Sequence, residues 1–166
     1  EKLRKEKVPE ENILFISIHA DHLFQSLSGS MIYIADARYL NHSRYGLTAS
    51  AYHIFQEYKY KNTYAFPRNM KLKSQALSQN LAKEIFMSFD RNEVAIYPNV
   101  PLRGYIIRGR RRYVPAVLRY NVIPTKLLIE IGNLNNKGDR ENMTDYRFRQ
   151  KAAQAILEGI LSYYND

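Results

Sequence analysis

The sequence predicts an α/β fold in which a mixed, mostly parallel sheet is flanked by helices. Two apolar runs typical of buried strands, residues 13–18 and 127–131, lie far apart along the chain. Two longer segments, residues 74–89 and 145–163, carry apolar residues at helical spacing. Strands that alternate with helices are typical of sheets covered by helices. In such sheets the functional groups lie at the carboxyl ends of strands.

The N-terminal part of the chain predicts two strands joined by a turn. Residues 1–12 are polar and charged, and residues 13–18 form a nearly continuous apolar run that ends at His19. Residues 26–30 are small and polar, which favours a turn, and residues 31–35 indicate the second strand.

Residues 36–73 follow no regular pattern and predict an insertion, or arm, within the domain. The segment holds six tyrosines and two histidines. Long loops in compact domains are usually functional or mobile. The arm is therefore either a surface excursion or a lid or regulatory arm over a substrate groove, and the residues do not separate these alternatives.

Each of the two long helical segments carries an apolar stripe with a spacing of four residues. The stripes are Leu77, Leu81, Ile85 and Phe89 in the first segment, and Phe148, Ala152, Ile156 and Ile160 in the second. Ser74 is a plausible N-cap for the first helix. Asp145, at the start of the second helix, suits the positive end of the helix dipole.

The region between the helical segments predicts loops and short strands. Strands are expected at residues 94–97 and 117–118, while residues 133–144 are rich in turn formers. Residues 108–112 are the densest positive cluster of the chain. Charge runs are usually solvated surface, but this one could also contact carboxylates of a substrate.

Composition limits the classes of protein and site. The formal net charge of +9 favours polyanionic partners, such as an envelope polymer, an anionic membrane surface or nucleic acid. Tyr105 and Tyr113 flank the basic run, yet we do not expect a nucleic-acid role. No apolar run is long enough for a transmembrane segment. Residues 1–12 lack the apolar core of a signal peptide, although the chain does not begin with Met.

The absence of cysteine excludes disulfides, thiolate metal sites and cysteine nucleophiles. A metal site in this chain would need His, Asp and Glu. The four histidines are His19, His22, His42 and His53.

His19 and Glu130 are the candidate reactive residues because each follows an apolar strand-like run. Imidazole is the commonest metal ligand, and a carboxylate beside a metal is the usual general base for a bound water. The pair therefore suggests half of a zinc hydrolase site. The alternatives are a structural histidine at a strand end and a buried carboxylate bonded to backbone N–H groups. A glutamate within an apolar run is costly without a partner, which favours function.

Segments along the chain follow the motif order of a known hydrolase family. Residues 15–21 look like its strand ending in Ser-Ile-His-Ala-Asn or Ser-Ile-His-Ala-Asp, and residues 124–136 look like its Pro-x-x-Leu-Val-Glu-x-Gly-Phe-x-x-Asn signature. Residues 29–33, 113–120 and 149–160 are similar to its Gly-rich turn, Val-Leu-Arg segment and closing helix. The chain therefore resembles the zinc-dependent N-acetylmuramoyl-L-alanine amidases of the amidase 3 family.

The resemblance implies roles for individual residues. His19 corresponds to a zinc ligand, Glu130 to the catalytic glutamate, and Arg119 and Asn136 to substrate-binding residues. Asp21 could orient His19 from behind, and His22 could reach a metal, although a solvated loop position suits His22 better.

Two features depart from the family pattern. The family's other two ligands, a His in Gly-His-Gly and a following Glu, precede the Ser-Ile-His strand, and this sequence contains no Gly-His-Gly. Residues 1–166 therefore look like a single catalytic domain that lacks its N-terminal part. Asn133 also stands where the family usually has Phe, which we expect to alter packing behind Glu130.

The implied function is hydrolysis of the amide between N-acetylmuramic acid and the L-alanine of the peptidoglycan stem peptide. The resemblance implies Zn²⁺ as cofactor, peptidoglycan as partner and a periplasmic or extracellular location. An envelope or cell-division regulator is a further possible partner. The alternative is a catalytically inactive amidase-like module that binds peptidoglycan or a cell-division partner.

Overall fold

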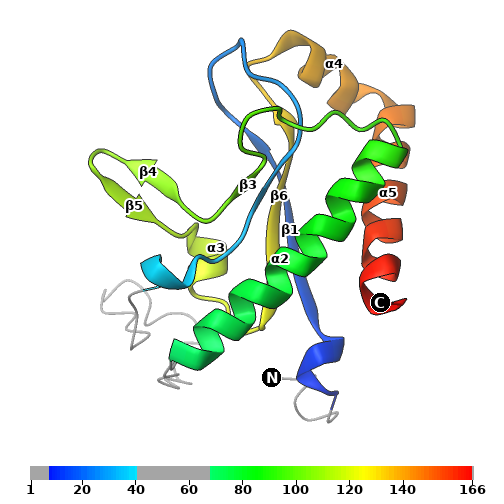
Figure 1. The fold of residues 1–166 in the computed structure, drawn as a ribbon. Helices are drawn as coiled ribbons and strands as arrows, with labels where there is room; N and C mark the ends of the chain where they lie inside the picture. Colours follow the sequence, from blue (N-terminus) through cyan, green and yellow to red (C-terminus); the bar gives the residue numbers. More distant parts are fainter. Residues whose placement is uncertain (1–7, 41–67, 166) are drawn as a thin grey trace, which may run out of the picture.

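The computed structural model describes residues 8–40 and 68–165 of the 166-residue chain (Figure 1). Its elements in chain order are η1 (Glu10–Asn12), β1 (Leu14–Asp21), β2 (Met31–Tyr33), η2 (Ala37–Tyr39), α2 (Arg68–Arg91), β3 (Leu102–Arg103), β4 (Ile106–Arg108), β5 (Arg111–Tyr113), α3 (Ala116–Arg119), β6 (Thr125–Asn133), α4 (Lys137–Thr144) and α5 (Tyr146–Asn165).

The main sheet has the strand order β1-β6-β2-β3. Strand β1 pairs with β6 in parallel, β2 pairs with β3 in parallel, and β2 pairs with β6 antiparallel. The predicted mixed, mostly parallel sheet is therefore confirmed. The two strands that carry the candidate reactive residues are direct neighbours, although more than a hundred residues separate His19 from Glu130 along the chain.

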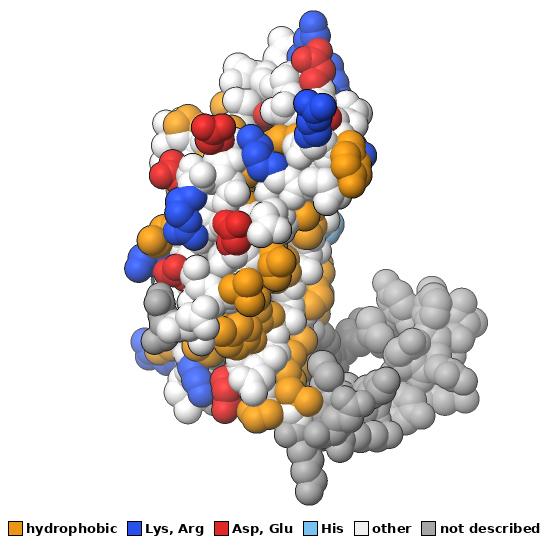
Figure 2. Space-filling model, turned by 90° about the vertical axis from the view of Figure 1, so that its right-hand side faces the viewer, with side chains coloured by type: hydrophobic (Ala, Val, Ile, Leu, Met, Phe, Trp, Pro, Cys, Tyr) orange, Lys and Arg blue, Asp and Glu red, His pale blue; other side chains and the backbone are white. Residues whose placement is uncertain are grey.

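The two long helices cover one face of this sheet. The apolar stripes of α2 and α5 join Ile32, Leu127 and Ile129 in one buried cluster. The helices approach closely at Gly159, where an added Cβ would lie 2.7 Å from the Cα of Ile85. Figure 2 looks onto the side of the molecule where α5 lies, and hydrophobic side chains gather there below a charged upper part.

The opposite face of the sheet carries a second, smaller cluster. Leu128 of β6 and Tyr33 of β2 pack there with Leu118 of α3 and Val114. The residues of a strand alternate between faces, so Leu127 and Ile129 contact the long helices while Leu128 and Glu130 lie on the α3 side. The candidate site is therefore on the face that the long helices leave open.

Residues 117–118, predicted as a strand, are instead part of α3, so that prediction is wrong. Pro115 is the N-cap of this helix. Proline is compatible with the start of a helix, because its φ angle is fixed and its missing N–H would have no partner within the helix. Leu118 is buried on the sheet. A short apolar run fits one helical turn as well as it fits a strand, which is why the pattern misled.

Helix α2 begins at Arg68, six residues before the predicted N-cap at Ser74. Ser74 lies inside the helix, where its hydroxyl donates a hydrogen bond of 2.6 Å to the carbonyl of Pro124. Residues 68–73, predicted as the end of the arm, are therefore helical, and residues 37–39 form η2. The central part of the predicted arm, residues 41–67, lies outside the described residues.

Two further elements differ from the sequence predictions. Residues 137–144, predicted as turn-rich, form α4, and the basic run lies in the two-stranded hairpin of β4 and β5. In the part of the chain that the structure describes, no helix is both long and apolar enough to cross a membrane.

Candidate active site

His19 and Glu130 lie side by side near the carboxyl ends of β1 and β6, which end at Asp21 and Asn133. The two residues are paired in the parallel register, so their side chains point to the same face of the sheet. The register shifts between His19 and Asp21, and such a bulge re-aims the side chains at the end of a strand. The sequence prediction that these two strand ends meet is confirmed.

Glu130 combines burial with an unsatisfied carboxylate oxygen. The residue is 9% exposed, and among the described residues its Oε2 has no hydrogen-bond partner. Burial, together with the nearby charge of Asp21, raises the pKa of Glu130 to about 7. A carboxyl with this pKa is partly ionised at neutral pH, which suits a general base.

We expect the metal-free Glu130→Gln variant to be more stable than the wild type at pH 8 but not at pH 4. The pKa of Glu130 in the folded protein, about 7, exceeds the ordinary 4.5. The carboxyl is therefore protonated below pH 4.5 in both the folded and the unfolded chain, and the folded protein loses stability as the pH rises from 4.5 through 7. Glutamine removes that loss, which amounts to at most about 3 kcal/mol. Denaturant unfolding at both pH values measures the effect.

The control for this prediction is Glu141→Gln, which alters an exposed side chain on α4. We expect this control to shift stability by less than about 0.5 kcal/mol at either pH. A Glu130→Gln variant that is less stable than the wild type at pH 8 would show that the carboxylate has a stabilising partner.

Tyr33 lies within electrostatic reach of Glu130 and is hydrogen-bonded to Arg103. Burial raises the pKa of Tyr33, while a hydrogen bond of 3.3 Å from Nη1 of Arg103 to its hydroxyl lowers it. The charges of Asp21 and Glu130 also act on Tyr33, so its hydroxyl lies within electrostatic reach of both carboxylates. Sequence reasoning missed Tyr33 and Arg103. The only sequence feature that could have indicated Tyr33 is its position on a predicted strand, and that position alone does not predict a neighbour of Glu130.

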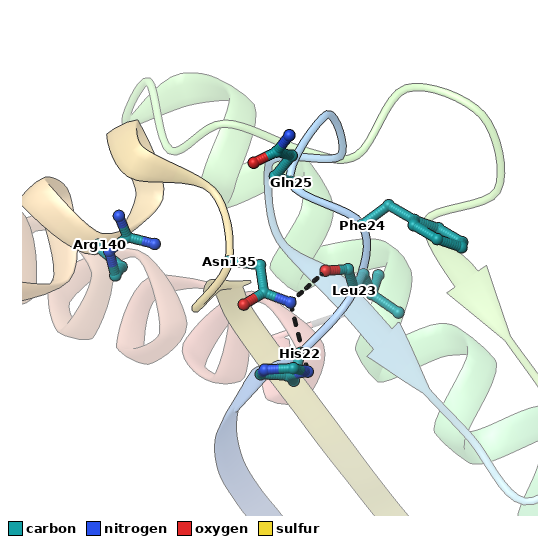
Figure 3. Close-up of a pocket in the computed structure, with 6 residues that line it drawn as sticks. All are labelled: His22, Leu23, Phe24, Gln25, Asn135 and Arg140. Carbon is teal, nitrogen blue, oxygen red and sulfur yellow. Dashed lines mark hydrogen bonds between the residues drawn. The ribbon is translucent and has the colours of Figure 1, made fainter.

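A loop after β1 places His22 beside a surface cavity of about 770 Å³ (Figure 3). The backbone N–H of His22 donates to Oδ1 of Asp21 at 2.7 Å, and its Nδ1 lies 3.3 Å from Nδ2 of Asn135. Phe24, which also lines the cavity, is 82% exposed. His22 is exposed in this loop, and its role as a further metal ligand stays a prediction.

Asn133 holds this loop in place. It is 1% exposed, and its Nδ2 donates to the carbonyls of Phe24 at 2.9 Å and Leu27 at 2.7 Å. Its Oδ1 accepts from the backbone N–H of Leu23 at 2.9 Å and of Asn135 at 3.1 Å. These contacts give Asn133 a hydrogen-bonding role in addition to the packing role that the sequence predicts.

Asp139 and Asn136 extend the network to α4. Oδ2 of buried Asp139 accepts from the backbone N–H of Gly29 at 3.1 Å and of Asn133 at 2.8 Å. Asn136 caps α4 by accepting from the Asp139 N–H, and its Nδ2 donates to the carbonyl of Gln25 at 2.8 Å. Both ends of the Asn136 amide are thus engaged within the protein, and its substrate-binding role stays a prediction.

Arg119 lies at the end of α3. Its guanidinium stacks over the ring of Tyr120, with 4.5 Å from Cζ to the ring centroid. Its Nε is buried and has no hydrogen-bond partner among the described residues. Arg119 is thus available for an anion, as a substrate-binding role would require, although the structure does not test that role.

The described residues fit one side of a zinc site. His19 offers an imidazole nitrogen, and Oε2 of Glu130 is a buried polar atom without a partner on the same face. Catalytic zinc sites use three protein ligands plus water. Within residues 8–40 and 68–165, no group of three or more His, Asp or Glu residues could hold a metal ion.

Comparison with known proteins shows the family. The family described as N-acetylmuramoyl-L-alanine amidase matches residues 5–162. An uncharacterized cell wall amidase of Bacillus anthracis is 46% identical over 48 residues, which cover 29% of this chain and 9% of that protein.

Solved structures share the fold. The amidase Ami1 of Mycobacterium smegmatis superposes with a TM-score of 0.59 at 19% identity, covering 98% of this chain and 57% of that one. The catalytic domain of CwlV from Bacillus (Paenibacillus) polymyxa gives 0.55 at 18% identity, covering 99% and 63%. The CwlD amidase of Clostridioides difficile, in complex with the GerS lipoprotein, gives 0.52 at 22% identity, covering 99% and 61%. The chain thus spans less than two thirds of each.

Proposed function

This chain belongs to the N-acetylmuramoyl-L-alanine amidase family, and we propose that its protein hydrolyses the amide between N-acetylmuramic acid and the L-alanine of the peptidoglycan stem peptide. The observation that carries the proposal is the buried carboxyl of Glu130 beside His19, with a pKa of about 7 and an Oε2 that has no hydrogen-bond partner among the described residues. A base with this pKa can take up and release a proton near neutral pH.

In the proposed reaction Glu130 acts as the general base. Its ionised carboxylate removes a proton from the water that attacks the amide carbonyl, and the protonated group then passes the proton to the leaving amine of L-alanine. We further propose that Arg119 and Asn136 contact the substrate, as the family resemblance implies.

His19 would be one of the residues that hold zinc. Zinc, when bound, polarises a carbonyl and lowers the pKa of water, which supports attack at neutral pH. In the family that this chain resembles, the remaining ligands precede the strand that corresponds to β1. We therefore propose that they come from residues outside the described part of the protein.

The proposed substrate implies action in the cell envelope, in the periplasm or outside the cell. Peptidoglycan is the proposed partner, and an envelope or cell-division protein is a second one. The CwlD structure, which holds a lipoprotein, supports such a partner by analogy.

The alternative is an inactive module that binds peptidoglycan. It is favoured by the absence, among the described residues, of a group of three or more metal-ligating side chains. A complete set of zinc ligands in the whole protein would favour the enzyme, because catalytic zinc needs three protein ligands. An incomplete set would favour the binding module.

Purified peptidoglycan incubated with the zinc-loaded whole protein tests the proposal. We expect mass spectrometry to find free stem peptides with an N-terminal L-alanine and intact glycan strands. Sedimentation with peptidoglycan but no released peptide, at any zinc concentration, would instead favour the binding module.

A further inference from the structure

A small cavity lies between the hairpin of β4 and β5 and helix α3. Its volume is about 230 Å³, and it is lined by Ile106, Arg108, Tyr113, Val114, Ala116 and Arg119. The lining thus combines apolar side chains with two guanidinium groups. The proposed hydrolytic step uses neither the cavity nor Arg108.

Arg119 lines this cavity and carries a donor that is unsatisfied among the described residues. Its buried Nε has no hydrogen-bond partner in the described part of the chain, and a buried donor without a partner costs about 1–3 kcal/mol, or more when it is charged. Stacking on Tyr120 restricts the plane of the guanidinium. A planar guanidinium with free N–H groups matches a carboxylate, which can accept two parallel hydrogen bonds.

The charge around the cavity also favours an anion. Between Val94 and Ile129 the sequence has six arginines, one lysine and no acidic residue. Among the described residues, neither Arg108 nor Arg119 forms an ion pair within 4.0 Å. The positive charge at the cavity is therefore not neutralised by the described part of the protein.

The cavity lies on the same side of the sheet as Glu130. Val114, which lines it, packs in the cluster of Leu118 and Leu128. Leu128 precedes Glu130 by two residues on β6, so both side chains point to that face. The cavity and Glu130 therefore share one face of the sheet, as two subsites for a single substrate would require.

The hairpin that forms one wall is anchored. Arg112 donates a hydrogen bond of 2.7 Å from Nη1 to the hydroxyl of Tyr39. Its Cζ lies 4.8 Å from the ring centroid of Tyr105. These contacts attach β5 to η2, while Arg110 lies exposed in the turn of the hairpin.

We propose that this cavity is a subsite for a carboxylate of the peptide part of the substrate, held by Arg119 and Arg108. The inference rests on the proposed function and specifies its substrate. A cavity of about 230 Å³ is smaller than most whole-ligand pockets, which suits one carboxylate-bearing residue rather than a sugar. Peptides with free carboxylates are therefore preferred over amidated ones.

Calorimetric titration of the zinc-free chain tests the subsite with two probes, L-alanyl-D-glutamate and its fully amidated form. We expect the acidic dipeptide to bind, and amidation to weaken binding at least tenfold. Arg119→Gln and Arg108→Gln each lower the affinity for the acidic dipeptide by a similar factor, while Arg119→Lys loses less. The amidated probe is insensitive to both glutamine substitutions, because the interacting carboxylate is absent.

Arg110→Gln is the matched control, because it removes the same charge from the exposed turn. We expect its affinity to stay within twofold of the wild type. If Arg110→Gln and Arg119→Gln weaken dipeptide binding equally, the dipeptide is attracted by the overall positive charge and not held at a subsite. That result would overturn the proposal. Tighter binding of inorganic phosphate than of the dipeptide would also overturn it, as would the absence of dipeptide binding.

Thermal unfolding of each variant shows whether it is folded. Arg108 is exposed, so its variant is expected to fold even if Arg119→Gln does not. The titration needs neither zinc nor Glu130. Arginine-dependent dipeptide binding by a protein without amidase activity would reject the proposed function alone. Amidase activity without that binding would reject the subsite alone.

Discussion

Glu130→Gln is expected to lower the rate of peptidoglycan amide hydrolysis by the zinc-loaded whole protein by about 10²–10⁴-fold. Glutamine has nearly the shape of glutamate but cannot take a proton from water at neutral pH. Glu130 is buried and its pKa of about 7 suits proton transfer near neutral pH, as the proposed role requires. The measurement is the initial rate of stem-peptide release, together with the zinc content of each preparation.

Exposed Glu141 supplies the control, since Glu141→Gln is expected to retain the wild-type rate. Zinc should remain bound in the Glu130→Gln variant, because the proposal makes Glu130 a base and not a ligand. Loss of zinc together with activity would reassign Glu130 as a ligand. A rate within tenfold of the wild type would mean that another group accepts the proton.

The pairing of His19 with Glu130 could be predicted because it depends on local patterns. Each residue follows an apolar run long enough to indicate a buried strand, and the carboxyl ends of parallel strands meet at one edge of a sheet. The two long helices were predictable for a similar reason, since their stripes repeat over several turns.

The elements that were missed are short or depend on distant contacts. Helix α3 has four residues, too few for a helical period to stand out from a strand pattern. The hairpin of β4 and β5 is rich in arginine, so no alternation of apolar and polar residues marked its strands. The raised pKa of Glu130 follows from its burial in the folded protein. A strand pattern predicts that burial raises the pKa of a carboxyl, but it does not predict by how much.

The polar network at the strand ends had no sequence signal at all. Asn133 contacts residues that lie more than a hundred positions earlier, and Asp139 does the same through Gly29. An asparagine in a turn-rich segment predicts a local turn more readily than a long-range contact. The family resemblance showed only that position 133 usually holds Phe. The structure shows that Asn133 instead forms hydrogen bonds with the loop after β1.

Asn133→Ala is expected to lower the free energy of unfolding by about 2–4 kcal/mol, the sum of several hydrogen bonds lost at a buried site. The substitution leaves the carbonyls of Phe24 and Leu27, and the N–H groups of Leu23 and Asn135, without their partner. Denaturant unfolding measures the change. Asn135→Ala, two residues later and only half-buried, is the control and should cost less.

Asn133→Phe separates hydrogen bonding from packing at this position. Phenylalanine, the usual residue of the family here, supplies apolar volume but no amide, so it is expected to destabilise this chain as well. The four contacts of Asn133 hold the loop that carries His22 and Phe24 beside the site. If the Asn133→Phe variant is as stable as the wild type, apolar packing alone holds the loop, and the hydrogen-bond account of Asn133 is wrong.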